Sequence, residues 1–340
     1  MIELQTPRGL KVQVPETEDE DPSPKFSPDQ HNEARRYYDE HGYAVVRGAI
    51  DPASCDQLKA LWAAEVKPSD SFIYRQATAK AERHVLNDKG WVMNPILNIQ
   101  SVDPKEFSEF RRVGTEKLLT DPVLTSVLRA LLDEDPLIVQ SMYFEGNSAT
   151  WEHQDTYYLD SEQVGAMTAA WIALEDIGAS AGRFFVCAGS HRIDMGLQSL
   201  ANNIADHHDE YIESVVAAIR KSGLEIRAPK LDKGDVLLWN ARTMHGSLNS
   251  QDVNRTRQSV TLHAIPSSHR FLQLQSRIVP LHIQEINGVK VHHPKDLSHL
   301  SARAVKRVES TFPDLFYGLK SLAIKTAIAA SSKRVSHGNN

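Results

Sequence analysis

Two short motifs carry side chains of the kinds that bind metal ions. The first is WEHQD, which holds His153 and Asp155, and the second contains His245, about ninety residues later. If the first motif is a strand, alternation points His153 and Asp155 to one face and Gln154 to the other. His245 could supply a third ligand from a different strand. Two imidazoles and one carboxylate on one face of an ion leave three positions open, which is typical of non-haem Fe(II) oxygenases.

A second pair of the same spacing, His207 and Asp209, lies in a stretch that is expected to be helical. Residues two apart on a helix point about 200° from each other, so these two side chains cannot hold one ion from one face. We interpret this pair as part of a solvated helix surface. The expected metal ligands are therefore His153, Asp155 and His245.

Several further motifs, in order along the chain, resemble those of the phytanoyl-CoA dioxygenase (PhyH) family of Fe(II)- and 2-oxoglutarate-dependent oxygenases. They span roughly residues 30–270 and comprise DEHGYAVVRG at 39–48, WIALED at 171–176, AGSHR at 188–192, GDVLLW at 234–239 and HGS at 245–247. One departure is Ala188, where the family usually has proline, and it touches no expected ligand. His191 belongs, by the same resemblance, to a structural turn.

The resemblance implies that 2-oxoglutarate is the cosubstrate, and its distal carboxylate then requires a buried cationic partner. The planar guanidinium of arginine suits that task better than lysine does. Arg255 and Arg257 both follow the HGS motif closely. We favour Arg257, because the segment that it begins, RQSVTLH, matches the arginine-led strand of the family. The resemblance also implies that Ser247 supports the same carboxylate and that Trp171 forms a wall of the pocket.

The pattern along the chain agrees with the jelly roll that the resemblance implies. Helical periodicity covers about residues 28–40, 52–65 and 104–132, and short runs rich in β-branched residues follow from residue 136. This succession favours a mainly β fold with flanking helices, a cupin-like double-stranded β-helix, over alternating βα units. A helical stretch at about 193–222 interrupts the strands, and we expect it to shape the substrate entrance.

Three parts are predicted along the chain. Residues 1–27 are polar and acidic, which is typical of a flexible N-terminal arm. Residues 28–270 form the PhyH-like oxygenase domain. Residues 271–340 form a C-terminal extension with a hairpin at Asn287-Gly288 and a Lys-rich helix at about 315–330 that packs on the core.

Composition narrows the class of protein and of partner. The net charge of −6 argues mildly against nucleic acid, which favours a basic face, and leaves a small-molecule substrate as the expected partner. The sequence has no apolar stretch of 18 residues, so no membrane span is predicted. The two cysteines, Cys55 and Cys187, have no spacing typical of a disulfide framework or a zinc–thiolate site, which fits a reducing cytoplasm.

Together these patterns predict a dioxygenase that uses Fe(II), 2-oxoglutarate and O2, with ascorbate as a candidate reductant. It would hydroxylate an unactivated C–H bond of a small organic substrate, with succinate and CO2 as coproducts. Asp155 favours hydroxylation, since by the resemblance the related halogenases lack this carboxylate. Two alternatives stay open: a cupin-like hydrolase or isomerase with zinc or manganese, which has no need of Arg257, and a non-catalytic jelly-roll binding protein.

Overall fold

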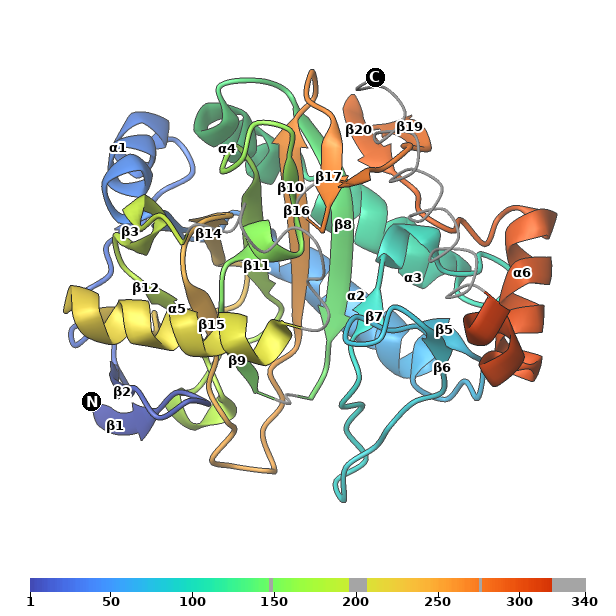
Figure 1. The fold of residues 1–340 in the computed structure, drawn as a ribbon, viewed down its shortest axis with the longest axis horizontal. Coiled ribbons are helices and arrows are strands. Elements are labelled where there is room, and N and C mark those ends of the chain that lie inside the picture. Colours follow the sequence, from blue (N-terminus) through green and yellow to red (C-terminus); the bar gives the residue numbers. More distant parts are fainter. Residues whose placement is uncertain (147–148, 196–206, 275–276, 320–340) are drawn as a thin grey trace, which may run out of the picture.

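The fold is built from two curled β-sheets that face each other, with helices on the outer side of the larger one (Figure 1). The computed structural model describes residues 1–146, 149–195, 207–274 and 277–319. Val186 of the smaller sheet and Trp239 of the larger one lie in the same buried cluster, so the inner faces of the sheets pack together. The double-stranded β-helix predicted from the sequence is confirmed.

The larger sheet, called the major sheet here, holds the longest strands. Its order is β19 (Ile283–Ile286), β20 (Val289–His292), β8 (Pro136–Phe144), β16 (Ser259–Pro266), β11 (Thr168–Ala173), β14 (Val236–Asn240), β4 (Tyr43–Val46) and β3 (Lys25–Phe26), with β7 (Ile96–Leu97) also paired to β8. The minor sheet has the order β1 (Ile2–Gln5), β2 (Lys11–Val14), β13 (Ile226–Arg227), β12 (Phe184–Cys187), β15 (His245–Ser247) and β9 (Thr150–His153).

Shorter pairings and helices complete the described part of the chain. The pairings are β10 (Leu159–Ser161) with β17 (Phe271–Gln273) and β18 (Arg277–Ile278), and β5 (Ile73–Tyr74) with β6 (Ala81–Glu82). The helices are α1 (His31–His41), α2 (Pro52–Leu61), α3 (Ser108–Val113), α4 (Pro122–Leu132), α5 (His208–Ser222) and α6 (Leu300–Thr311), with π-helical turns at Trp62–Val66 and Gly114–Leu119.

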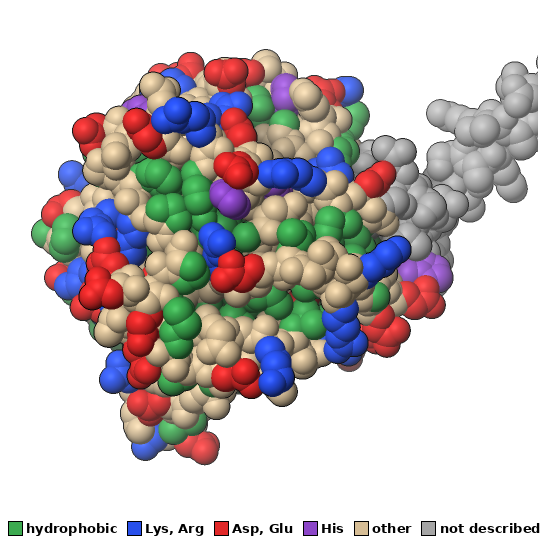
Figure 2. Space-filling model, turned by 90° about the vertical axis from the view of Figure 1, so that its left-hand side faces the viewer, with side chains coloured by type: hydrophobic (Ala, Val, Ile, Leu, Met, Phe, Trp, Pro, Cys, Tyr) green, Lys and Arg blue, Asp and Glu red, His purple; other side chains and the backbone are tan. Residues whose placement is uncertain are grey.

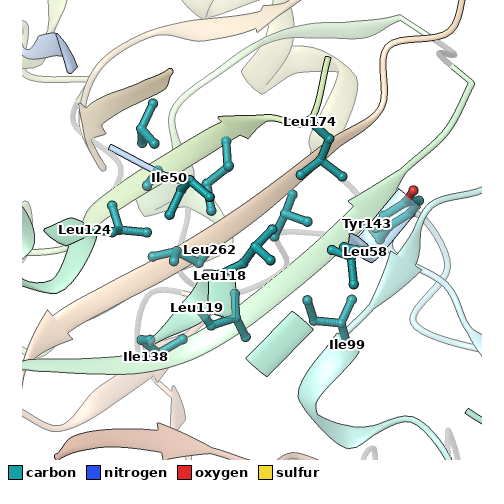
Figure 3. Packing of buried hydrophobic residues seen from close by; sticks show 14 of the residues in the cluster. Ile50, Leu58, Ile99, Leu118, Leu119, Leu124, Ile138, Tyr143, Leu174 and Leu262 are labelled. Atoms are coloured by element: carbon teal, nitrogen blue, oxygen red, sulfur yellow. The ribbon is translucent and has the colours of Figure 1, made fainter. Parts of the chain in front are cut away.

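The main core lies between the major sheet and helices α2, α3 and α4. Leu58 of α2 and Leu124 of α4 share one buried cluster with Ile138 of β8 and Leu262 of β16 (Figure 3). Fully burying a side chain of this size stabilises the fold by about 1.5–3 kcal/mol, so this cluster fixes the outer face of the sheet. Because strand residues alternate, the neighbour of Leu262, His263, points to the opposite, inner face.

A β-bulge interrupts the pairing of β8 with β16 beside that inner face. His263 is opposite Gln140, whereas the next residue, Ala264, is opposite Ile138, so Val139 is the extra residue. Bulges bend a strand and redirect its side chains, and they occur often next to active sites. Here the bulge places Gln140 and Val139 together on the interior side of the sheet.

The N-terminal segment differs from the flexible arm that was predicted for residues 1–27. It forms the hairpin of β1 and β2, which joins the minor sheet through β13, and Val14 is fully buried. The hydroxyl of Thr6 donates to the carboxylate of Glu152, and the backbone N–H of Arg8 donates to the same group at 3.3 Å. The acidic composition concealed this pairing, because the partners lie far along the chain.

Within the C-terminal segment predicted as an extension, strands β19 and β20 join the major sheet. The hairpin of β19 and β20 turns at Asn287 and Gly288 as predicted, with φ of 52° and 75°, which suits a tight turn of left-handed residues. Strand β20 then pairs in parallel with β8. The C-terminal segment therefore supports the strand that carries Gln140.

Helix α6 is placed by one buried carboxylate. Glu309 accepts hydrogen bonds from the hydroxyl of Tyr74 at 3.1 Å and from the backbone N–H of Ala81 at 3.0 Å. These contacts dock α6 on the pair β5–β6, as Figure 1 shows at its right-hand side. The Lys-rich helix predicted at 315–330 falls largely within residues 320–340, outside the described residues.

The surface of the described part carries charges of both signs. On the face seen in Figure 2, acidic and basic side chains are interspersed and do not form a field of one sign. This mixture agrees with the modest net charge of −6. Among the described residues, no helix has both the length and the apolar character that crossing a bilayer requires.

One buried imidazole in the C-terminal hairpin should make stability depend on pH. Nδ1 of His292 lies 3.0 Å from the backbone N–H of His282, and burial lowers the pKa of His292 to about 4, although the His282 carbonyl partly offsets this effect. The unfolded chain binds this proton near pH 6.5, so the free energy of unfolding should fall as the pH drops from about 6.5 to 4. Denaturant unfolding across this range measures the slope, which His292→Asn should flatten; an identical slope in the variant would contradict the assignment.

Candidate active site

The three expected metal ligands lie together between the two sheets. His153 ends β9 and His245 begins β15, and the two are directly opposite each other in the sheet. Their Nε2 atoms are 3.7 and 3.5 Å from Oδ1 of Asp155. Asp155 begins a short 3-10 turn, Asp155–Tyr157, and is not on the strand itself. Gln154 keeps an extended backbone, so the alternation that placed Asp155 beside His153 still holds.

Both imidazoles are oriented for metal binding by their own backbone. Nδ1 of His153 donates to the carbonyl of Trp151 at 2.9 Å, and Nδ1 of His245 donates to the carbonyl of Thr243 at 2.8 Å. A carbonyl only accepts, so each Nδ1 carries the proton and each Nε2 presents a lone pair. With Asp155, these ligand atoms lie within 4.8 Å of one another. The donor set therefore fits ferrous iron.

The second oxygen of Asp155 is held away from the ligand cluster. Its Oδ2 accepts a hydrogen bond from the indole Nε1 of Trp239 at 2.8 Å and lies 3.5 Å from Nε2 of His263. Contacts of this kind fix the orientation of a metal ligand, and their loss typically costs about 10–100-fold in metal affinity. Asp155 can therefore offer Oδ1 alone to an ion.

The electrostatics of the three ligands suit a dication. Burial lowers the pKa of His245 to about 3 and lowers that of His153, so both imidazoles are neutral near pH 7. Burial raises the pKa of Asp155, but the surrounding imidazoles outweigh it and hold that pKa below its usual range. The site thus presents one negative charge and two neutral nitrogen donors without competing protons.

The structure separates the two candidate arginines. Arg257 is buried, its Nη1 donates to the carbonyl of Gly182 at 2.7 Å, and its guanidinium faces the rings of Trp171 and Phe144 at 5.6 and 5.8 Å. Burial lowers its pKa to about 9, so the group stays charged at neutral pH. Arg255 instead lies at the surface, with its Nε 3.4 Å from Asp252. The geometry favours Arg257 as the partner of a carboxylate.

An aromatic wall connects the region of the metal ligands with that arginine. Phe184 stacks on His245 with ring centroids 5.3 Å apart, and Trp171 stacks on Phe184 at 5.9 Å. Trp171 in turn faces the guanidinium of Arg257. The hydroxyl of Ser247 accepts from the backbone N–H of Thr150 at 2.9 Å, which ties β15 to β9. A dicarboxylate between ion and arginine would lie against an apolar surface.

Helix α5, the described part of the predicted insertion, covers the strand that carries His153 (Figure 1). The hydroxyl of Tyr211 accepts from the backbone N–H of Gln154 at 2.8 Å, and its ring stacks on Tyr157 at 3.7 Å. The hydroxyl of Tyr158 lies 2.7 Å from Nε2 of His208. Residues 196–206 of the insertion lie outside the described residues. The helix therefore fixes the segment on either side of Asp155.

The other histidine motifs stand apart from this cluster. The imidazole of His207 pairs with Glu210 at 2.9 Å, and Asp209 is 89% exposed. Nε2 of His191 lies 3.2 Å from the carbonyl of Asp39, in agreement with a structural turn. The described residues contain one set of three ligand atoms close enough to share an ion, and that set is His153, Asp155 and His245.

Sequence reasoning did not identify three side chains that complete the site: Trp239, His263 and Phe184. Two of them could have been found by alternation. His263 is six residues after Arg257, so the alternation of side chains places both on the same face of the sheet. Trp239 is paired with Ala169, which is two residues from Trp171 and therefore shares its face of the major sheet. No comparable signal marks Phe184, because β12 becomes part of the site only through its pairing with β15.

Gly246 is expected to be essential for the spacing of β9 and β15. A Cβ at this position would lie 2.5 Å from the carbonyl oxygen of Thr150 and 2.7 Å from the ring of Phe185, closer than real contacts. Gly246→Ala should therefore move β9, separate the two histidine ligands and lower metal affinity by about tenfold or more, although no ligand is changed. Metal titration of the folded variant tests this, with Gly318→Ala, whose Cβ meets nothing within 4 Å, as the control. Unchanged affinity in the alanine variant would contradict it.

Comparisons with known proteins agree with this geometry. The family model described as phytanoyl-CoA dioxygenase (PhyH) matches residues 38–258. Phytanoyl-CoA dioxygenase domain-containing protein 1 of Danio rerio is 24% identical over 199 residues, which cover 47% of this chain and 64% of that protein. The Bos taurus protein of the same name is 28% identical over 152 residues, 42% of this chain and 50% of that one. The chain thus spans about half to two thirds of the length of these relatives.

Solved structures show the same fold at low sequence identity. The non-haem α-ketoglutarate-dependent carbocyclase SnoK from nogalamycin biosynthesis has a TM-score of 0.53 at 16% identity, over 73% of this chain and 89% of that one. EctD from S. alaskensis, with 2-oxoglutarate and 5-hydroxyectoine, has a TM-score of 0.52 at 18% identity, over 83% and 92% of the chains. At these low sequence identities, the structural similarity shows a shared fold and nothing further.

The fold and the ligand set match those of one class of protein, the non-haem, iron- and 2-oxoglutarate-dependent dioxygenases. The jelly roll supplies two facing sheets, and the ligand set of two histidines and one aspartate is the one this class uses. Within the class, the chain belongs to the phytanoyl-CoA dioxygenase (PhyH) family.

Proposed function

We propose that this chain hydroxylates an unactivated C–H bond of a small organic molecule at the expense of O2 and 2-oxoglutarate. One oxygen atom enters the substrate as a hydroxyl group, and the other enters succinate. 2-Oxoglutarate loses its C1 carboxylate as CO2 and supplies two electrons. The observation that carries the proposal is the pairing of the metal-ligand cluster with a buried, charged Arg257 across one aromatic wall.

Iron(II), when bound, would supply the activation of O2. His153, Asp155 and His245 are the residues that would hold it, and they would do so on one side, so that the opposite side stays open to cosubstrate and O2. The backbone carbonyls that accept from the two Nδ1 atoms keep the imidazoles from rotating. Trp239 keeps the second oxygen of Asp155 occupied, which reserves the first for the ion.

Arg257 would hold the distal carboxylate of 2-oxoglutarate, and its planar fork suits two parallel hydrogen bonds. Trp171 and Phe184 would exclude water from the region between this arginine and the ion. Exclusion of water strengthens the attraction between the guanidinium and the carboxylate. Ser247, in our proposal, supports the same carboxylate while it keeps β15 paired to β9.

The proposal is tested by turnover of the cosubstrate. The purified full chain, supplied with Fe(II), ascorbate and O2, should convert 2-oxoglutarate to succinate slowly even without a primary substrate. Omission of O2 or replacement of Fe(II) by Zn(II) should stop succinate formation, because zinc is not redox active. No succinate from a protein that binds both Fe(II) and 2-oxoglutarate would argue against an oxygenase and in favour of a non-redox jelly-roll protein.

A further inference from the structure

Exposed apolar side chains are concentrated at the C-terminal end of the described chain. Among the described residues, sixteen large hydrophobic side chains are exposed, and six of them lie between residues 300 and 319: Leu300, Val305, Val308, Phe312, Leu315 and Leu319. Their exposed fractions run from 49% to 76%. Single exposed apolar residues are ordinary on a monomer, but a contiguous group of them marks a surface that contacts something else. These six side chains are called the apolar face below.

The spacing of these residues follows the repeat of a helix. In α6 and its C-cap residue, Phe312, the exposed apolar residues after Leu300 stand three and four positions apart, and in the helical turns at 313–319 they stand four apart. Residues at these spacings share one side of a helix. The backbone N–H of Phe312 donates to the carbonyl of Val308, and that of Phe316 donates to the carbonyl of Phe312, each at 2.9 Å. The second helical segment therefore follows directly on α6.

A different side of this segment is fixed to the rest of the protein. The buried carboxylate of Glu309 accepts from Tyr74 and Ala81 on the pair β5–β6, and it also accepts from the hydroxyl of Tyr317. One carboxylate thus holds both α6 and the turns that follow it. Figure 1 shows α6 at the edge of the molecule, with its outer side turned away from both sheets. The apolar face is therefore held in place and open to the surroundings.

The sequence around the apolar face is basic, although the chain as a whole has a net charge of −6. From Leu300 to the C-terminus it contains seven basic and two acidic residues. One of the two acids is Glu309, which is buried and already accepts three hydrogen bonds. Among the basic residues, Lys306 and Arg307 lie within α6 itself, and Arg307 is exposed. After Asp314 every charged residue is basic, and these four residues lie outside the described ranges.

We propose that this face docks the protein on the surface of an anionic lipid membrane. The apolar side chains would enter the boundary between head groups and acyl chains, and the neighbouring lysines and arginines would contact the anionic head groups. A helical segment with an apolar side and an excess of basic residues suits such a surface, on which it lies without crossing the bilayer. The inference does not depend on the reaction proposed above.

A second copy of the chain is a poorer partner for the apolar face. Two copies that met through α6 would each bring Lys306, Arg307 and the basic C-terminal residues to the contact. Asp314 is the one acid of this segment left to offset them, since Glu309 is occupied. Like charges weaken such an interface, whereas anionic head groups attract the same charges. The charge of the segment therefore favours a lipid surface.

Co-sedimentation of the full chain with vesicles measures the attachment. Vesicles of phosphatidylcholine that contain about 30% phosphatidylserine are compared with vesicles of phosphatidylcholine alone. Each basic residue near an anionic surface strengthens binding by about fivefold, so the anionic vesicles should bind the protein at least about tenfold more tightly. This preference should shrink as salt is added. Equal binding to the two kinds of vesicle, or binding to neither, would overturn the proposal.

Two double variants assign the attachment to this face. Phe312→Ser/Leu315→Ser removes two exposed apolar side chains, so the fold should remain and binding to the anionic vesicles should fall by at least about tenfold. Lys306→Gln/Arg307→Gln should lower the preference for anionic over neutral vesicles by about tenfold or more. Circular dichroism verifies that each variant is folded. Binding as tight as that of the wild type in the folded serine variant would contradict the proposal.

The matched control is Val164→Ser/Val253→Ser. These two valines are exposed to a similar degree, 54% and 60%, but belong to other parts of the chain. Their replacement removes the same kind of surface and should leave vesicle binding unchanged. An equal loss of binding in this control would show that the attachment is not specific to the apolar face, and would overturn the proposal.

Sedimentation velocity in the absence of lipid tests the second copy as the occupant. The wild type and Phe312→Ser/Leu315→Ser should sediment alike, as the same species. A wild-type dimer that the serine variant converts to a monomer would show that the face binds another copy of the chain, and would overturn the assignment to lipid.

Discussion

Asp155→Asn is expected to abolish iron binding while the fold is retained. Asparagine has the size of aspartate and can still accept from the Trp239 indole, but it removes the one negative charge that the site offers a dication. Loss of an outer partner of a ligand typically costs about 10–100-fold in metal affinity, so loss of the ligand charge itself should cost at least about hundredfold. Anaerobic Fe(II) titration measures the affinity, and succinate formation should fall to background.

The matched control for this variant is Asp209→Asn. Asp209 has a histidine at the same spacing but lies exposed on a helix, so its replacement should leave Fe(II) affinity unchanged. Circular dichroism of both variants verifies that the fold is intact. An Asp155 variant that is folded and binds Fe(II) as tightly as the wild type would contradict the assignment of the ligands.

Arg257→Gln should have the second largest effect, and it should act on the cosubstrate. Removal of one partner of a buried, hydrogen-bonded charge pair costs about 2–5 kcal/mol, which corresponds to about 30-fold or more in affinity. The KM for 2-oxoglutarate should therefore rise by about hundredfold, with Fe(II) affinity little changed. Arg257→Lys should recover a part of the loss, because lysine restores the charge but not the planar fork.

Arg255→Gln is the control for this experiment, since the two arginines are two residues apart but only Arg257 is buried. It should leave the KM for 2-oxoglutarate unchanged. If 2-oxoglutarate binds equally well to the Arg257→Gln protein, the cosubstrate site lies elsewhere. That result would favour a metal-dependent hydrolase or isomerase on the same scaffold.

The fold class and two of the three metal ligands could be predicted from sequence because they are encoded locally. The prediction of the pair His153 and Asp155 needs only an extended backbone at Gln154, so it holds although the strand ends at His153. The central strands of the major sheet, β8, β16 and β11, have nine, eight and six residues and are long enough to be recognised from the sequence. The distal His245 required the family resemblance, since nothing local says which strand lies opposite β9.

The parts that could not be predicted depend on pairings between distant segments. Strand β2 has only four residues, and it joins the minor sheet only through its pairing with the distant strand β13. Phe184 enters the site through register with Ser247, and Gln140 borders it because of a bulge. The strand propensity of a segment does not say which distant strand it pairs with, because tertiary context decides that pairing.

The N-terminal hairpin has a consequence for how the site is made during synthesis. Gln13 pairs with Arg227, and Thr6 contacts Glu152, the residue just before the ligand His153. Strands β1 and β2 can pair with each other early, but their hairpin can dock on β13 and Glu152 only after most of the remaining chain has been made. The iron site can reach its final form only after that late return of the first residues, which makes metal loading a natural marker of completed folding.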